Sequence, residues 1–291
     1  MTTLEQPLKV YPLFCPQIPF KDRFGNYTPF VEMNPAMVWD SVNQEYVVIV
    51  RGVNYRKLAN KSFTLYQTPA HSIYWIARGN NLSNLEFKEL KVDYGGLPLY
   101  SSYWNGVEDA RFINSKTLLV TVPWLDKRGQ PTMFTCSLEN DVLCKFQRCE
   151  PSDRAEKNWM PCSDQTSVIY SCSPFVKKDL VSDQQEIISL APMLQGYHGS
   201  TNGICWNNSS KELYLVHKSV EDKVIHRWVV INHDTKQVKV SDPFTFFNHT
   251  HIEFPCSLQK VGHSLFVSLG VNDEKAFIIQ VKPPFDLLLL L

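Results

Sequence analysis

The sequence feature that most constrains the fold is a short unit that occurs five times along the 291 residues. Each copy has a cluster of polar residues, a short strand, a polar turn and then a strongly apolar strand. Asn, Asp, Gly, Ser and Pro separate such runs throughout the chain, and helical periodicity is almost absent, which is typical of an all-β protein. The copies lie near residues 34–51, 108–122, 157–172, 198–217 and 253–269.

The spacing of these copies predicts the architecture. Four-stranded blades of a β-propeller recur about every 40–50 residues, and most of the matching apolar strands follow one another at that interval. We therefore expect residues 1–291 to form a single domain, a five-bladed β-propeller with a central funnel. The longer first interval is expected to hold an insertion around residues 58–87. A β-sandwich, or two small β domains, is the alternative, and it explains a fivefold unit less well.

The polar clusters stand where the innermost strand of each blade begins, close to the axis of a propeller. Their side chains are therefore expected to converge on one funnel. Buried charges cost several kcal/mol each unless they are paired or used, so a ligand site is favoured over a ring of structural salt bridges between blades. The residues expected in the funnel are Asn34, Arg51, Glu108, Asp109, Arg111, Lys157, Asn158, His198, His217, Lys218, Glu253 and Asp273.

Composition excludes several classes of protein. Lysine plus arginine equals aspartate plus glutamate at 29 each, which argues against a nucleic-acid-coating protein. The first residues lack the pattern of a signal peptide, and no apolar run is long enough to span a bilayer. The eight cysteines have no metal-finger spacing. We expect a cytoplasmic protein whose cysteines are mostly reduced and buried.

Motifs at these clusters resemble a known family. Gly106-Val107-Glu108-Asp109-Ala110-Arg111 is similar to the G-x-E-D-P-R motif of the β-mannoside phosphorylase family and its five-bladed relatives. The other blades carry weaker likenesses in the same order, and the resemblance runs from about residue 30 to 281. These further segments are Asn34-Pro35 with Tyr46 to Arg51, Glu156 to Trp159, His198 to Ser200, Tyr214 to Lys218, Ile252 to Phe254 and Gly270 to Asp273.

The resemblance implies roles for individual residues. Asp109 matches the family's catalytic carboxylate, which delivers a proton toward the glycosidic oxygen, and Arg111 would bind sugar or phosphate. Phosphate-contacting residues are expected at Arg51, Lys157 and His217. Ala110 departs from the family's proline, which loosens the turn that holds Asp109. We also assign Glu108 and Glu253 to the catalytic group, and substrate binding to Asn34, Asn54, Asn158, Trp159, His198, Lys218 and Asp273.

The chemistry of these residues separates three reactions. Inverting hydrolysis needs a second carboxylate to activate water, but the first blade presents Asn34, an amide, unless Glu253 or Asp273 takes that role. A phosphorylase needs only cations around phosphate and one acid. Asp109 would be the acid, and the groups that fit the phosphate are Arg51, Lys157, His217 and Lys218. A glycosyltransferase would use the same cations on the leaving phosphate or diphosphate of its donor.

From the sequence we expect an inverting glycosyltransferase-type enzyme that makes or remodels a β-linked glycan. It would use a sugar-phosphate or nucleotide-sugar donor and a glycan acceptor. No D-x-D triplet occurs, so no metal and no other cofactor is expected. The first alternative is an inverting phosphorylase or hydrolase of β-mannoside-like oligosaccharides. The second is a non-catalytic glycan-binding propeller, against which the presence of Glu108, Asp109 and Arg111 together argues.

Overall fold

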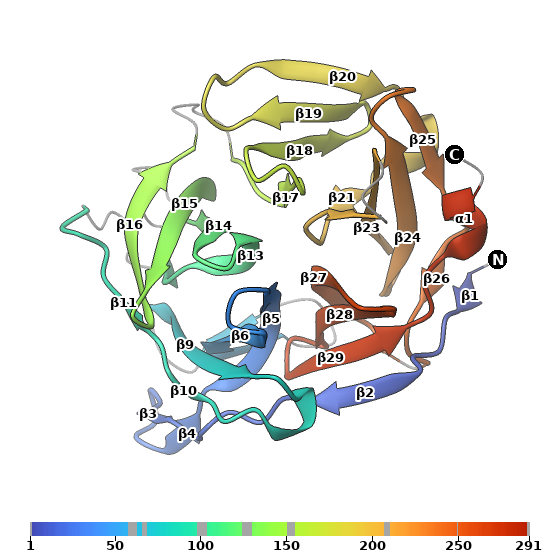
Figure 1. Cartoon of the computed structure of the whole chain (residues 1–291). Coiled ribbons are helices and arrows are strands. Elements are labelled where there is room, and N and C mark those ends of the chain that lie inside the picture. The colour runs from blue at the N-terminus through green and yellow to red at the C-terminus, as the bar shows by residue number, and fades with distance from the viewer. Residues whose placement is uncertain are drawn as a thin grey trace.

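The chain folds into a ring of β-sheets around a central axis (Figure 1). The structure is a computed structural model that describes residues 2–57, 63–65, 69–97, 104–123, 130–149, 155–206, 210–248 and 250–289. Within these ranges, five sheets of four to seven strands form the ring, and two further hairpins lie outside it. The predicted all-β, five-bladed propeller is confirmed.

The first two blades come from the N-terminal half of the chain. Blade 1 consists of β5 (Val31–Asp40), β6 (Glu45–Val53), β9 (Ala70–Gly79) and β10 (Lys88–Glu89), with β12 (Trp104–Asn105) beside β9. Blade 2 consists of β13 (Glu108–Asn114), β14 (Thr117–Val122), β15 (Thr132–Glu139), β16 (Val142–Arg148) and, at its outer edge, β11 (Lys91–Val92).

The other three blades complete the ring. Blade 3 consists of β17 (Met160–Pro161), β18 (Ser167–Cys172), β19 (Phe175–Asp179) and β20 (Gln185–Ser189). Blade 4 consists of β21 (His198–Gly199), β22 (Ile204–Cys205), β23 (Lys211–Val220), β24 (Lys223–Asn232), β25 (Gln237–Val240), β26 (Phe244–Thr245) and β1 (Thr3–Leu4). Blade 5 consists of β27 (Glu253–Val261), β28 (Ser264–Val271), β29 (Lys275–Val281) and β2 (Lys9–Pro12).

The N-terminal segment closes the ring. Strand β2 pairs antiparallel with β29, so the first residues of the chain supply the outermost strand of the last blade. Strand β1 runs parallel to β26 in blade 4. Because β2 pairs with β29, the backbone groups on that side of β29 are hydrogen-bonded within the blade.

Apolar strands form the middle of each blade because neighbouring blades cover both of their faces. Residues 46–53 of β6 are all buried, as are residues 265–271 of β28. The core consists of clusters between adjacent sheets rather than one central mass. One such cluster joins blades 1 and 2 through Val47, Ile49, Leu118 and Val120.

The long first interval differs from the sequence expectation. Strand β9, within the predicted insertion at 58–87, is the third strand of blade 1 and pairs along its length with β6. An additional hairpin of β7 (Tyr55–Lys57) and β8 (Phe63–Leu65) precedes it. Residues 58–62 and 66–68 of the predicted insertion lie outside the described residues. A 3₁₀ turn at Leu82–Asn84 follows β9.

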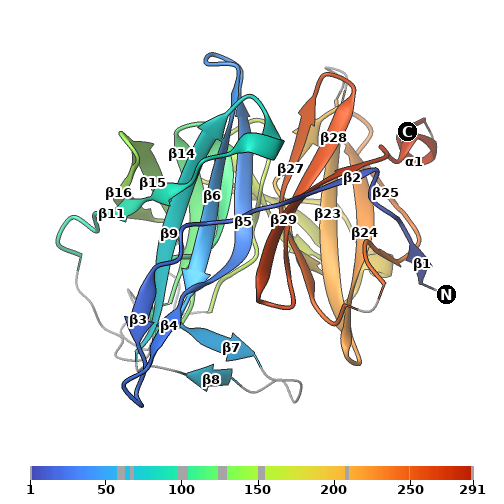
Figure 2. The ribbon, with the colours of Figure 1, turned by 90° about the horizontal axis from the view of Figure 1, so that it is seen from below.

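The remaining elements lie at the periphery. The hairpin of β3 (Pro19–Lys21) and β4 (Tyr27–Pro29) lies at the same end of the molecule as β7 and β8, and the β5–β6 turn lies at the opposite end (Figure 2). The other helical turns are Pro192–Leu194 and α1 (Phe285–Leu289). No helix in the described part of the chain has the length and apolar character needed to cross a membrane.

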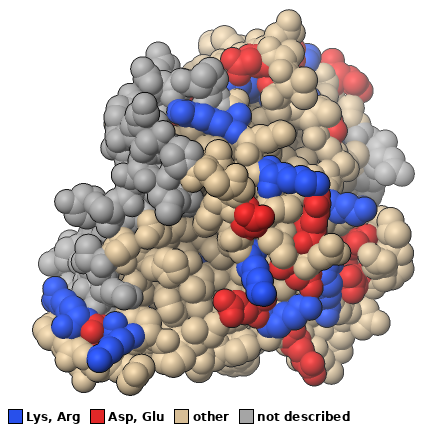
Figure 3. Space-filling view, turned by 90° about the vertical axis from the view of Figure 1, so that its left-hand side faces the viewer, with Lys and Arg blue, Asp and Glu red and all other residues tan. Residues whose placement is uncertain are grey.

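The outer face of blades 1 and 2 carries both signs of charge. Figure 3 shows basic and acidic side chains interspersed on the side of the molecule that lies at the left of Figure 1. Ion pairs on blades 1 and 2 include Nζ of Lys88 2.8 Å from Asp141 and Nζ of Lys145 2.6 Å from Glu139. Exposed pairs of this kind contribute little to stability, because solvent screens the two charges.

Candidate active site

Irregularities in the innermost strands turn polar side chains toward the axis. The pairing register shifts between Met33 and Ala36 in β5 and between Glu108 and Arg111 in β13. At these two bulges Asn34 and Asp109 have φ of 43° and 47°. Asn and Asp tolerate this left-handed region better than other non-glycine residues, and bulges commonly re-aim side chains beside active sites.

Asp109 and Asn34 face each other across the boundary of blades 1 and 2. Asn34 Nδ2 donates a hydrogen bond of 2.9 Å to Asp109 Oδ1. Asn34 is almost fully buried, whereas Asp109 keeps partial access to solvent. The contact holds one carboxylate oxygen in a fixed direction and leaves the other for a ligand. It also offsets the freedom expected from Ala110 in place of proline.

Arg51 links the same two blades beside this pair. Its Nη2 lies 2.8 Å from Glu108 Oε1, and its Nε donates to Ser72 Oγ at 2.9 Å. Its Nη2 also lies 3.3 Å from the hydroxyl of Tyr55. Burial raises the pKa of Glu108, and the guanidinium of Arg51 opposes that shift. Glu108 is thus paired with Arg51, and 25% of its side chain is exposed.

Arg111 reaches across the axis to blade 4. It is fully buried, and its Nε donates to the carbonyl of Ser200 while its Nη1 donates to the carbonyl of Asp109 at 3.0 Å. Its third nitrogen, Nη2, has no hydrogen-bond partner among the described residues. A buried guanidinium nitrogen of this kind costs free energy unless a ligand accepts from it.

Basic groups from blades 3 and 4 stand on the other side of Asp109. His217 on β23 pairs in register with His198 on β21, and their ring centroids are 5.8 Å apart. Burial lowers the pKa of His217 well below its ordinary value, and the charges of Arg111 and Lys157 act in the same direction. Burial and then Lys157 lower the pKa of His198. Lys157 and His198 are exposed, so both remain accessible to an anion.

Asp273 and Asn158 are two further residues that the sequence predicted for the site. Burial raises the pKa of Tyr55 to about 12; Arg51 opposes the rise, while the charges of Glu108, Asp273 and Asp109 add to it. Asp273 is therefore close enough to Tyr55 for its charge to act on that hydroxyl. Asn158 has φ of 64°. Its carbonyl approaches Gly199 so closely that a Cβ there would clash with it.

Three predicted site residues have structural surroundings instead. Glu253 is 1% exposed, and its oxygens accept from the backbone N–H groups of Phe246 and Phe247, from Thr250 Oγ1 and from His226 Nε2. These contacts occupy the acceptor positions of the carboxylate. They lower its pKa, although burial acts the other way. This saturation does not fit the catalytic role expected for Glu253.

The predictions for Trp159 and Asn54 as substrate-binding residues are also wrong. Trp159 is fully buried, its indole N–H donates to Glu156 Oε2 at 3.1 Å, and the ammonium of Lys178 lies 4.8 Å from its ring centroid. It cannot present a face to a sugar. Asn54 is also fully buried. Its side chain accepts a hydrogen bond from the backbone N–H of His71 and donates one to the carbonyl of Pro69, which fixes this loop. Both residues stabilise the blades.

Lys218 does not belong to the basic group. It follows His217 on β23, and alternate residues of a strand point to opposite faces. Its Nζ donates to the carbonyl of Gln195 at 3.1 Å and lies 5.7 Å from the ring centroid of Tyr197. Lys218 was predicted as a site residue because it is adjacent to His217 in the sequence. The alternation of side chains along β23 directs it away from the site.

The structure adds residues that the sequence did not suggest. Ser72 and Ser200 are buried serines that hold Arg51, Arg111 and His217. Cys256 lies at the register shift of β27 and is close enough to Asp109 for that charge to add to the burial that raises its pKa. Ser200 is the last residue of the segment 198–200 that resembles the family, and the sequence alone predicted no separate role for it.

A separate hollow of about 690 Å³ lies at the other end of the axis. The turns between the inner strands of all five blades line it, and none of the predicted site residues does. Its lining includes Asp40, Asn114, Ser163, Cys205 and Lys260.

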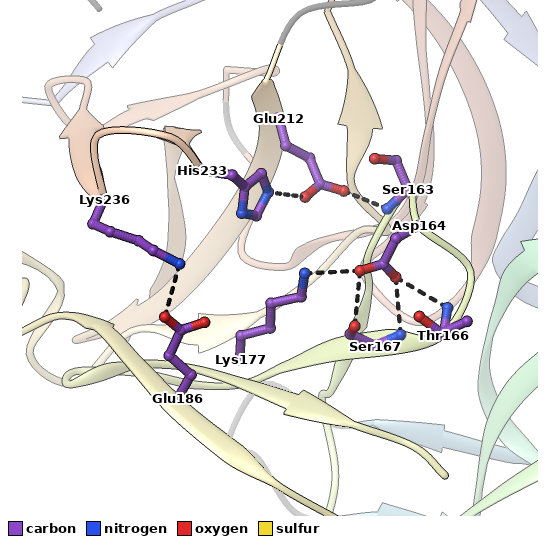
Figure 4. A network of polar contacts seen from close by, with 9 residues as sticks. All are labelled: Ser163, Asp164, Thr166, Ser167, Lys177, Glu186, Glu212, His233 and Lys236. Carbon is purple, nitrogen blue, oxygen red and sulfur yellow. Dashed lines mark hydrogen bonds and ion pairs between the residues drawn. The ribbon is translucent and has the colours of Figure 1, made fainter. Parts of the chain in front are cut away.

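A network beside this hollow fixes the turn between β17 and β18 (Figure 4). Glu212 accepts from the backbone N–H of Ser163 and, at 2.8 Å, from His233 Nε2. Asp164 accepts from Lys177 and from the Thr166 and Ser167 N–H groups. The charged side chains of this network therefore have a structural role, because each is paired within the protein. Among the described residues, no group of three or more His, Cys, Asp or Glu residues is arranged to hold a metal ion.

Comparison with known proteins shows the fold. No family model matches the chain, and neither does any curated protein. Solved structures do. A glycosyl hydrolase from Bacteroides ovatus is 11% identical with a TM-score of 0.61, covering 97% of this chain and 94% of its own. The β-1,2-mannobiose phosphorylase from Listeria innocua is 12% identical with a TM-score of 0.55, covering 97% and 98%.

A third structure belongs to a study of the GH130 family of mannoside phosphorylases, which contains glycoside hydrolases that target β-1,2-mannosidic linkages. It is 10% identical with a TM-score of 0.63, covering 97% of this chain and 94% of its own. The chain has the propeller fold of these carbohydrate-active enzymes. The resemblance inferred from the Gly106–Arg111 motif is confirmed at the level of the fold.

Proposed function

We propose that this protein is an inverting glycoside phosphorylase that acts on β-linked, mannoside-like oligosaccharides. The structural neighbours reported above are named as hydrolases and phosphorylases, including one that acts on β-1,2-mannobiose. We therefore favour cleavage of a glycoside over the nucleotide-sugar transfer expected from the sequence. Phosphorolysis in reverse is still transfer from a sugar phosphate, so the two expectations share one site.

The observation that supports phosphorolysis is that the carboxylates around the axis differ in how far other groups pair with them or hydrogen-bond to them. Glu108 is paired by Arg51 and Glu253 is saturated by hydrogen bonds, while Asn34 occupies the first-blade position. Asp109 therefore stands beside basic groups without a neighbouring first-blade carboxylate to activate water. A site with one acid and several cations suits an anionic nucleophile.

In the proposed reaction, protonated Asp109 donates its proton to the glycosidic oxygen as the bond from C1 to that oxygen breaks. An oxygen of hydrogen phosphate forms the new bond to C1 from the opposite face of the ring, which inverts the anomeric centre. The products are an α-sugar 1-phosphate and a shortened saccharide that carries the donated proton. The phosphate proton returns to Asp109, so the reaction is balanced. Arg111, Lys157 and His217 are the proposed phosphate contacts.

The test is to incubate the full chain with β-1,2-mannobiose and related β-mannosides, with and without inorganic phosphate. We expect a sugar 1-phosphate only when phosphate is present. Asp109→Asn should lower kcat by about 10²–10⁴-fold, the usual contribution of a general acid, without changing the thermal unfolding midpoint greatly. Asn26→Asp, on the remote β3–β4 hairpin, is the control. Full activity of Asp109→Asn would exclude its role as the acid.

Hydrolysis is the second candidate, because Asp273 could be the second carboxylate that activates water. Its charge acts on Tyr55, which contacts Arg51. Hydrolysis predicts free reducing sugar at the same rate with and without phosphate. In that case Asp273→Asn, and not the phosphate contacts, would abolish turnover. Product analysis by chromatography distinguishes the two reactions in one experiment.

A further inference from the structure

Ser200 contacts two of the proposed phosphate-binding residues at once. It follows β21 in blade 4 and is fully buried. Its carbonyl accepts from Arg111 Nε, which comes from blade 2 on the other side of the axis. Its hydroxyl lies 2.7 Å from Nδ1 of His217, which comes from β23 of its own blade. One small residue thus sets the positions of two basic side chains.

The direction of the hydrogen bond between Ser200 and His217 follows from proton counting. A serine hydroxyl has one proton to donate, and a neutral imidazole has one nitrogen that donates and one that accepts. His217 Nδ1 is the one hydrogen-bond partner of the Ser200 hydroxyl within the described part of the chain. If Nδ1 carried a proton, the buried hydroxyl would have no acceptor among the described residues, which is unfavourable for a donor removed from water. The hydroxyl therefore donates and Nδ1 accepts.

We propose that Ser200 is a positioning residue that holds His217 as the neutral tautomer protonated on Nε2. His217 then offers a hydrogen-bond donor to a phosphate oxygen without adding a positive charge. Arg111 and Lys157 supply the charge at the site. The assignment of the tautomer stands on the structure alone, whereas its use for phosphate rests on the proposed function.

The surroundings of His217 favour the neutral ring. On its own blade it faces His198 from β21 and His226 from β24, and from other blades it faces Arg111 and Lys157. Its ring also packs against Phe254 of β27, with centroids 5.0 Å apart. Burial comes first in lowering its pKa, and each of these groups acts in the same direction. A protonated ring would place another cation among them and would remove the acceptor of Ser200.

The experiment is nitrogen NMR of the full chain labelled with ¹⁵N-histidine, in which the two ring nitrogens report their protonation directly. His217 is assigned by comparison with His217→Gln. We expect an unprotonated Nδ1 and a protonated Nε2, without change between about pH 8 and pH 5, where an ordinary imidazole titrates. A protonated Nδ1, or a ring that is charged at neutral pH, would overturn the proposal. This spectrum needs no substrate and no variant at Ser200.

The matched variants are Ser200→Ala and Ser268→Ala. Ser268 is also a fully buried serine, but its hydroxyl donates to the carbonyl of Pro35 and touches no histidine. Ser200→Ala keeps the carbonyl that binds Arg111 and removes only the donor to His217. We expect it to mix the two tautomers of His217 and to move the ring's titration toward neutral pH. Unchanged His217 signals in Ser200→Ala, or an equal change in Ser268→Ala, would contradict the role of Ser200.

Calorimetry with inorganic phosphate separates this proposal from the proposed function. Loss of one oriented donor, worth about 1.4 kcal/mol, should weaken phosphate binding about ten-fold in Ser200→Ala. If the wild-type chain shows the expected tautomer but binds no phosphate, the proposed function fails and the positioning role stands. If phosphate binds equally to both proteins while the tautomers differ, the link between His217 and phosphate fails.

Discussion

At the scale of single residues, the site depends on how neighbours limit each charged group. Asp109 and Glu108 are adjacent in the sequence but differ in their surroundings. The first accepts a hydrogen bond from a neutral amide, and the second is paired with Arg51. In the proposed reaction, this difference distinguishes the acid, Asp109, from Glu108, which fixes a guanidinium. The hydrogen bond from Asn34 is therefore expected to influence Asp109 directly.

Replacing Asn34 with Asp tests that influence. A carboxylate would replace the amide that now lies 2.9 Å from Asp109, and two carboxylates this close cannot both ionise at neutral pH. The proton they share would keep the general acid protonated to higher pH. We expect the alkaline limb of the kcat/KM profile for phosphorolysis to shift upward by at least about one pH unit.

Asn26→Asp is the matched control for this change. Asn26 also donates from its side-chain amide to an aspartate, Asp22, but lies on the exposed β3–β4 hairpin. The same change of charge at that position should leave the pH profile unaltered. If Asn34→Asp has the same profile as the wild type, Asn34 does not control the protonation of Asp109.

At the scale of elements, the register shifts of β5 and β13 are the features that build the site. A regular inner strand would alternate its side chains between the two faces of the blade, with none directed along the axis. The shifts require space, and glycine provides it next to Asn34. A Cβ at Gly270 on β28 would lie 2.3 Å from Asn34 Oδ1 and 2.9 Å from its backbone nitrogen.

Gly270→Ala should therefore displace Asn34 from Asp109. Overpacking of a buried position costs about 1–3 kcal/mol, and we expect at least a ten-fold loss of phosphorolysis in addition. Gly262→Ala is the control, because that glycine is in the turn of the same hairpin, has φ of 59° and has open space around it. Its cost should be limited to backbone strain of about 1 kcal/mol. Equal urea midpoints and equal activities of the two variants would contradict this account.

At the scale of the whole molecule, closure of the ring through β2 positions the inner strands relative to one another. Residues from blades 1, 2 and 4 meet at Asp109 and Arg111, so any opening of the ring separates them. Strand β2 contributes a paired outer strand to blade 5, and Leu13 and Cys15 behind it pack in the core between blades 1 and 5.

Removal of residues 1–12 should destabilise the protein by several kcal/mol and expose β29 as an unpaired edge. Removal of residues 1–7 leaves β2 in place and deletes β1 and the hydrogen bond from Trp228 to Glu5. We expect a much smaller effect from this shorter truncation. Thermal unfolding and light scattering measure both. Similar unfolding midpoints of the two truncations would show that β2 does not close the ring.

The sequence by itself determined the repeated unit, the apolar strands and the order of the polar clusters. Alternation and turn residues are local properties, and the Gly106–Arg111 motif identified the position of Asp109. Only the tertiary structure decided which members of those clusters remain accessible. Glu253, Trp159 and Asn54 have residue types that also suit a sugar site, but the fold buries them. Hydrogen bonds to nearby turns and loops occupy their polar atoms. Conversely, the role of Ser200 arises from contacts with His217 and with Arg111, 89 positions away. Burial and hydrogen-bond saturation depend on which strands meet in space, and a pattern along one strand does not contain that information.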